Sequence, residues 1–229
     1  FGPVGHEPVV QRLRLEPLGH GREADALGRH PGSRVVPVAE VAGDDQHALP
    51  RLERLRELKP AFADEAIAER FPEIGWGITA GNSSQVSDGA SAALIVEENV
   101  ASRLGLKPRA AITHFALAGD DPIIMLLAVI PATRKLLERA GIGIGDIAAF
   151  EVNEAFASVP LAWQKAFDAD PDRMNAMGGA IALGHPLGMS GARLVTTAMY
   201  QLHRTGGRYA LCTMCIGVGQ GIAVLIERV

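Results

Sequence analysis

From about residue 109 onward, apolar residues recur along the chain with two different periods. Short continuous apolar runs are typical of buried strands, and apolar residues three or four positions apart indicate amphipathic helices. The predicted strands are residues 109–118, 146–152, 208–215 and 222–229. The predicted helices are residues 130–141, a helix that begins at Asn153 or Glu154 and ends at 167, and residues 191–206 capped by Ser190. Strands that alternate with helices predict an α/β fold with a covered sheet.

The preceding stretch, from residue 51 to 105, is less regular. Its first leucines have helical spacing, and Pro60 is expected to stop that helix. Residues 76–105 predict a short strand, a polar loop and then a helix of small residues that ends at Gly105. We expect the small residues around Gly89 and Ala93 to let this helix lie close against a neighbour.

The first fifty residues use a restricted set of amino acids, with no Lys, Ile, Thr, Asn, Tyr, Met, Cys or Trp. Gly, Pro, Arg and His recur there without a helical or strand period, which predicts a poorly ordered lead-in at residues 1–50. Two hypotheses explain it: a translation of GC-rich DNA in the wrong frame, or a natural flexible linker. The chain begins at Phe1, so we expect that an N-terminal segment precedes it.

Composition excludes several classes of partner. The chain has 229 residues, 48% of them hydrophobic, and a formal net charge of -4. Nucleic acids and anionic membranes require a dense basic surface, so neither is an expected partner. The two cysteines, with no signal-like or membrane-length apolar run, indicate the reducing cytoplasm.

One candidate functional segment is residues 174–194, "MNAMGGAIALGHPLGMSGARL". Glycine lets the backbone approach a ligand closely, and His185 stands between Gly184 and Pro186. A lone histidine is commonly structural. Because glycines here leave the ring free to face a ligand, we interpret His185 as a general base or a hydrogen-bond donor.

The two cysteines predict different environments. Cys212 lies inside a strand and reads as a small core residue, whereas Cys215 precedes the glycine run "IGVGQG". In a continuing strand the two side chains point to opposite faces, which argues against a disulfide or a shared metal ion. Asn153 stands where a strand ends, so its amide either caps a helix or holds a water or a substrate carbonyl.

Four segments in this order resemble the thiolase family of acetyl-CoA acetyltransferases and 3-ketoacyl-CoA thiolases. They are "TAGNSSQVSDGASAALIV", "VNEAFA", "GGAIALGHPLGMSGARL" and "CIGVGQG". The resemblance implies an α/β, thiolase-like layered fold that is incomplete, with residues 51–107 as the end of the family's N-terminal half and 108–229 as its C-terminal domain. It also implies assembly as a homo-oligomer, a dimer or a tetramer.

The resemblance further implies a reaction and a set of roles. The family cleaves 3-ketoacyl-CoA with CoA, or runs the reverse condensation; CoA is a substrate, and no separate cofactor or metal ion is expected. His185 would activate the nucleophilic cysteine and help form an oxyanion hole, and Asn153 would orient a water for that same hole. Cys215 would act as the acid/base. The Gly217 amide would bind the acyl oxyanion, and Ser84 would lie against the pantetheine arm.

There is one departure from the family pattern. The family's acyl-accepting cysteine lies in the N-terminal half, and neither Cys212 nor Cys215 occupies its motif. We therefore expect this chain to be impaired or inactive alone. The alternatives are a non-catalytic CoA-binding fragment and a gene remnant. A β-ketoacyl synthase relative is a weaker alternative, because those sites commonly use two histidines. Acyl chain length and reaction direction do not follow from the residues.

Overall fold

The computed structural model describes residues 52–229, and the structural statements below concern this part of the chain. The chain divides into two units, residues 1–55 and 56–229. The predicted lead-in at residues 1–50 lies outside the described residues. Helix α2 (Leu52–Arg56) agrees with the leucine spacing, although it ends before Pro60. The domain boundary expected near residue 107 stays a prediction.

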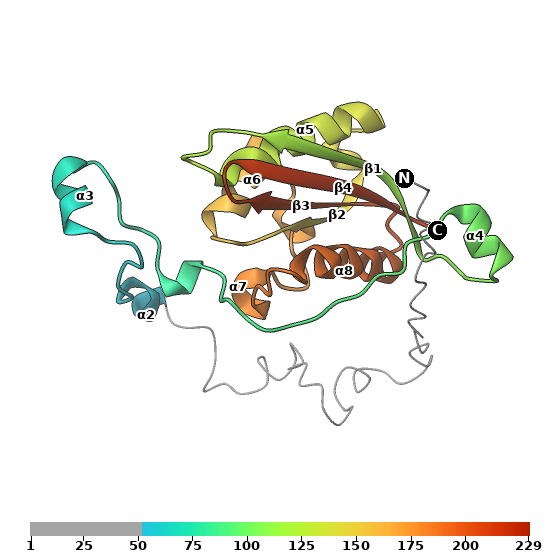
Figure 1. Cartoon of the computed structure of the whole chain (residues 1–229), viewed down its shortest axis with the longest axis horizontal. Helices are drawn as coiled ribbons and strands as arrows, with labels where there is room; N and C mark the ends of the chain where they lie inside the picture. Colours follow the sequence, from blue (N-terminus) through green and yellow to red (C-terminus); the bar gives the residue numbers. More distant parts are fainter. Residues whose placement is uncertain (1–51) are drawn as a thin grey trace, which may run out of the picture. The chain divides into compact units, whose positions relative to one another are not determined.

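A four-stranded sheet forms the centre of the second unit, and its strands are the four that the apolar runs predict (Figure 1). They are β1 (Ala110–Gly119), β2 (Ile147–Val152), β3 (Tyr209–Ile216) and β4 (Gln220–Arg228). The spatial order is β1-β4-β3-β2. β4 is antiparallel to both of its neighbours, whereas β2 and β3 are parallel. The predicted α/β class is confirmed.

Helices cover both faces of this sheet (Figure 1). Helices α5 (Val129–Ala140) and α6 (Ser158–Phe167) pack on one face, and their core includes Leu136, Phe150 and Trp163. Helix α8 (Ser190–Thr205) packs on the other face through Leu194, Ala198 and Leu202. The other helices are short: α3 (Glu65–Arg70), α4 (Glu98–Arg103) and α7 (Ala180–Leu183). None of the helices within residues 52–229 has the length and apolar character that crossing a membrane requires.

Two helix starts differ from the prediction. α6 begins at Ser158, not at Asn153 or Glu154. The Asn153 N–H continues the sheet ladder by donating to the Thr213 carbonyl at 3.0 Å, so the backbone is still extended there. Ser190 was expected to cap α8, but it is the first residue of the helix. Its hydroxyl bonds to the Pro186 carbonyl and the His185 ring instead of capping the helix.

The predicted helix of small residues does not form, and neither does the short strand predicted before it. Residues 88–97 form an extended coil without helical or strand pairing (Figure 1), and within residues 83–105 only α4 is helical. In place of the strand, Thr79 makes one isolated bridge to Pro60. A short helix is marginal unless one face packs on a partner, and Leu94, Ile95 and Val96 are all exposed.

The close approach expected of the small residues is observed at Gly89. A Cβ on Gly89 would lie 2.7 Å from Cγ of Pro186, which is closer than real Cβ contacts allow. Glycine therefore lets the extended segment pass directly beside the loop that contains His185.

Candidate active site

The candidate site lies where the parallel strands β2 and β3 end. Asn153 directly follows β2, and Cys215 is the penultimate residue of β3. Carboxyl ends of parallel strands meet at one edge of a sheet, which is where ligands bind in α/β folds. The hydrogen bond from Asn153 N to Thr213 O places the asparagine two residues from Cys215 along the neighbouring strand.

The side chains of Asn153 and His185 meet at this edge. Asn153 Nδ2 lies 3.4 Å from His185 Nε2, although 32 residues separate them. Asn153 is 1% exposed, and its Oδ1 has no hydrogen-bond partner among the described residues. A buried acceptor without a donor is uncommon and costly. The site therefore offers a place for a hydrogen-bond donor, such as a water, next to the imidazole.

The loop that contains Ser84 contacts the segment after Asn153 and the loop that contains His185. Ser84 donates to the Ala155 carbonyl through its N–H at 3.0 Å and through its hydroxyl at 3.1 Å. The His185 N–H donates to the Gln85 carbonyl at 2.8 Å. The structure thus brings Ser84, Asn153 and His185 together from three separate segments.

Glu154 holds the glycine-rich segment in place, and sequence analysis missed this role. Its carboxylate accepts hydrogen bonds from the Ile181 N–H at 3.0 Å and from Asn175 Nδ2 at 2.8 Å. A Cβ on Gly179 would overlap this carboxylate, which explains why a glycine precedes α7. No periodicity or spacing indicates this contact, because its partners lie more than 20 residues apart.

A buried ion pair stands behind the site. Glu151 on β2 is 2% exposed, and its Oε2 lies 3.1 Å from Nη1 of Arg193 on α8. Burial raises the pKa of Glu151 to about 7, against the opposing attraction of Arg193. A charged residue within the apolar strand "IAAFEV" was the available sequence signal, since buried carboxylates are rare unless paired.

The two titratable site residues are both shifted toward their neutral forms. Burial, and secondly the positive charge of Arg193, lowers the pKa of His185. Burial raises the pKa of the Cys215 thiol. A neighbouring imidazolium or backbone amides would favour a Cys215 thiolate, but burial dominates here and favours the neutral thiol.

The two cysteines lie on opposite faces of the sheet, as predicted. Cys212 is buried in the core under α8, and Cys215 packs against the core under α5 and α6. Both are free thiols. Gly217 is exposed in the turn between β3 and β4, beside Val218 at φ 65°. Its role in binding an oxyanion stays a prediction.

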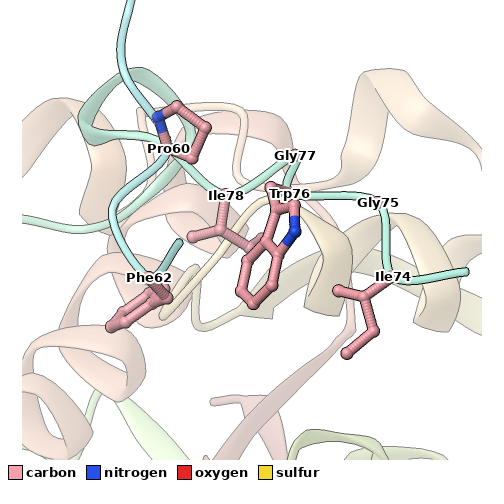
Figure 2. A pocket seen from close by; sticks show the side chains of 7 residues that line it. All are labelled: Pro60, Phe62, Ile74, Gly75, Trp76, Gly77 and Ile78. Atoms are coloured by element: carbon pink, nitrogen blue, oxygen red, sulfur yellow. The ribbon is translucent and has the colours of Figure 1, made fainter. Parts of the chain in front are cut away.

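Two further features complete the search for sites. Within residues 52–229, no three His, Cys, Asp or Glu side chains are grouped as metal ligands would be. The predicted absence of a metal ion and of a separate cofactor stays a prediction. An apolar hollow separate from His185 is lined by Pro60, Phe62, residues 74–77 and Ile78 (Figure 2). No titratable side chain lines it, so we assign it no chemistry.

An α/β sheet with asparagine, histidine and cysteine at one strand edge is the arrangement that the four motifs led us to expect. The family model described as thiolase, C-terminal domain, matches residues 106–228. The chain belongs to the thiolase family.

Individual relatives agree with this assignment. The chain is 51% identical over 189 residues to the Escherichia coli 3-oxoadipyl-CoA/3-oxo-5,6-dehydrosuberyl-CoA thiolase, which covers 81% of this chain and 45% of the relative. It is also 51% identical over 166 residues to the Photorhabdus laumondii 3-ketoacyl-CoA thiolase, covering 71% of this chain and 43% of the relative. The chain thus spans less than half the length of these relatives.

Solved structures resemble the chain to a similar extent. Human mitochondrial 3-ketoacyl-CoA thiolase matches with a TM-score of 0.69 and 39% identity, over 80% of this chain and 44% of that one. The acetyl-CoA acetyltransferase of Bacillus anthracis matches with a TM-score of 0.68 and 36% identity, over 77% and 42% of the two chains. The incomplete thiolase-like fold is therefore confirmed.

Proposed function

We propose that this chain provides the acid/base part of a thiolase site, which cleaves 3-ketoacyl-CoA with CoA or joins two acyl-CoA molecules in reverse. The observation that supports this most is the Asn153–His185 contact, with the buried Asn153 Oδ1 left for a donor. Cys215 lies near the end of the strand next to Asn153. The printed names of the relatives supply the substrate class.

Cys215 is suited to proton transfer at carbon. When a nucleophile adds to the keto carbon and the bond between the α-carbon and that carbon breaks, the electron pair stays on the α-carbon as a thioester enolate. This carbon then needs a proton. Since burial raises the pKa of Cys215, the thiol keeps its proton near neutral pH and can donate it. In the condensation direction the same sulfur takes the proton back.

His185 and Asn153 serve the carbonyl end of the reaction. A neutral imidazole accepts a proton from a thiol nucleophile, and the lowered pKa of His185 keeps the ring neutral. Asn153 Oδ1 accepts a hydrogen bond from a water whose other proton faces the developing oxyanion. The Gly217 N–H adds a second donor, and Ser84 lies along the pantetheine arm of CoA.

The covalent step requires a nucleophile that these residues do not provide. The 229 residues contain two cysteines. Cys212 is buried in the core, and we assign Cys215 to proton transfer at the α-carbon of the substrate. We therefore expect this chain by itself to show little or no thiolysis, because loss of a covalent nucleophile removes several powers of ten in rate.

The test is thiolysis by the purified 229-residue chain, with acetoacetyl-CoA and a longer 3-ketoacyl-CoA as substrates, CoA as acceptor and Cys215→Ser as control. Calorimetry with CoA on the same sample measures binding. Binding without turnover supports the proposal for this chain. Turnover that disappears in Cys215→Ser contradicts it, because Cys215 would then act without a second cysteine. A folded chain with neither activity nor CoA binding favours the gene remnant.

Assembly and location complete the proposal. β1 is an edge strand of the sheet, and it exposes Phe115 and Leu117, an apolar surface that pairing of copies into a dimer or tetramer would cover. Gel filtration tests this, and a monodisperse monomer contradicts it. Two free thiols suit the reducing cytoplasm, which fractionation of cells tests.

A further inference from the structure

The hydroxyl of Ser190 lies between the ring of His185 and the carbonyl of Pro186. We infer that Ser190 is a positioning residue that keeps the proton of neutral His185 on Nδ1 and leaves the lone pair of Nε2 facing the site. The inference rests on the proposed function only for the use of Nε2 as the base. The location of the proton is a property of the chain itself.

The hydrogen bonds of Ser190 determine the direction of its contact with the ring. Ser190 Oγ is hydrogen-bonded to His185 Nδ1, and it also donates to the Pro186 carbonyl at 2.9 Å. A hydroxyl has one proton to donate and lone pairs to accept with. With that proton directed at the carbonyl, Oγ must accept, so Nδ1 must be the donor. Ser190 is 1% exposed, so bulk water does not compete for these bonds.

The contact at the other ring nitrogen is consistent with the same assignment. Asn153 Nδ2 lies 3.4 Å from His185 Nε2, and an amide NH₂ group can only donate. With the amide in this orientation Nε2 presents a lone pair, which agrees with a proton on Nδ1. The bonds of Ser190 carry the assignment, and the contact from the loop after β2 agrees with it.

The neutral form of the ring, for which a tautomer is defined, is favoured by the surroundings. Burial lowers the pKa of His185, and the charge of Arg193, which lies one turn after Ser190 on α8, lowers it further. The first turn of α8 thus presents a hydroxyl that orients the ring and a guanidinium that disfavours its protonation.

The experiment is two-bond ¹H–¹⁵N NMR of the full chain with ¹⁵N-labelled histidine, at a pH above the ordinary histidine pKa. Loss of its signals in His185→Gln identifies His185. We expect the Nδ1–H tautomer in the unmodified chain. In Ser190→Ala the ratio of Nδ1–H to Nε2–H should fall about fivefold or more, as expected when one neutral hydrogen bond is lost.

Thr196→Ala is the matched control. Thr196 Oγ1 donates to the carbonyl four residues earlier, Ala192 O, at 2.8 Å, as Ser190 does to Pro186. Its loss removes the same kind of backbone bond from the same helix, and the tautomer of His185 should stay unchanged. Ser190→Thr retains a hydroxyl and should retain the Nδ1–H form.

The inference is overturned by an Nε2–H tautomer in the unmodified chain, or by a folded Ser190→Ala whose tautomer ratio does not change. If Ser190→Ala does not fold, the tautomers of the unmodified chain and of Ser190→Thr decide. Neither result depends on turnover or on CoA binding. Failure of the proposed function is therefore distinguishable from failure of this inference.

Discussion

Residues 56–109 and residues 110–229 belong to the same unit, yet they bury very different amounts of apolar surface. The first region supplies one residue, Ala101, to the buried hydrophobic core, and the second supplies all the others. Residues 56–109 expose large apolar side chains such as Phe62, Phe71 and Ile95. The comparison shows that stability resides in the sheet and its helices, where apolar burial is concentrated.

The two regions nevertheless meet at the candidate site. Backbone bonds join Ser84 to Ala155 and Gln85 to His185. The packed region holds Asn153, His185 and Cys215, to which we assign the acid/base chemistry, and the loosely packed region adds the loop that we assign to the pantetheine arm. The core thus fixes Asn153, His185 and Cys215, whereas the position of the Ser84 loop beside them depends on a few hydrogen bonds.

The largest expected contrast uses the chain's two tryptophans, one in each region. Trp163 is fully buried, with its ring centroid 5.2 Å from that of Phe150 and its Nε1 donating to Thr133 Oγ1 at 2.9 Å. Trp163→Ala should lower the free energy of unfolding by about 4 kcal/mol. Trp76 is only partly buried at the apolar hollow, and Trp76→Ala should cost much less, about 1 kcal/mol.

Urea unfolding followed by circular dichroism measures both changes, because neither variant then depends on tryptophan fluorescence. Similar losses from the two variants would mean that residues 56–109 contribute to the core as much as the sheet does, and the comparison would fail.

A second, somewhat smaller effect concerns the pH dependence of the packed region. Burial raises the pKa of Glu151 from its ordinary value of 4.5 to about 7. The folded state therefore binds a proton more tightly than the unfolded state. This contribution to stability is present in full below about pH 4.5 and is lost as pH rises toward 7, by at most about 3 kcal/mol.

Urea titrations at several pH values test this dependence. Glu151→Gln cannot ionise at this position, so its free energy of unfolding should vary less between pH 5 and 7 than that of the unmodified chain. An equal slope in both proteins would show that Glu151 does not titrate in this range when folded.

The smallest effect is expected in the extended segment of residues 88–97. Ile95 is 71% exposed, so Ile95→Lys should change the free energy of unfolding by less than about 0.5 kcal/mol. It should also reduce aggregation, because it interrupts the exposed apolar run Leu94–Val96. Thermal unfolding and light scattering measure the two effects.

Ile226→Lys is the matched control, since Ile226 is an isoleucine in extended backbone with no exposed surface. Burying an unpaired ammonium there should prevent folding. A large loss of stability in Ile95→Lys would reveal packing of residues 88–97 that their exposure does not indicate.

The local pattern of apolar residues was sufficient to predict a helix or strand wherever its period matches the face that the structure buries. All four strands, α5 and α8 follow from their apolar spacing, since each packs one face on the core. His185 was recognisable because glycines flank it, and Asn153 because it ends a strand. The opposite faces of Cys212 and Cys215 follow from the strand period of two.

Tertiary structure alone decided the rest. The helix predicted over residues 88–97 does not form, because Leu94, Ile95 and Val96 find no apolar surface to pack on, and the sequence alone cannot show this. The clamp from Glu154 to Asn175, the pair of Glu151 with Arg193, and the bond of Ser190 to His185 each join segments through space. Periodicity reports which face of an element is buried; which polar groups meet behind that face depends on how the elements pack.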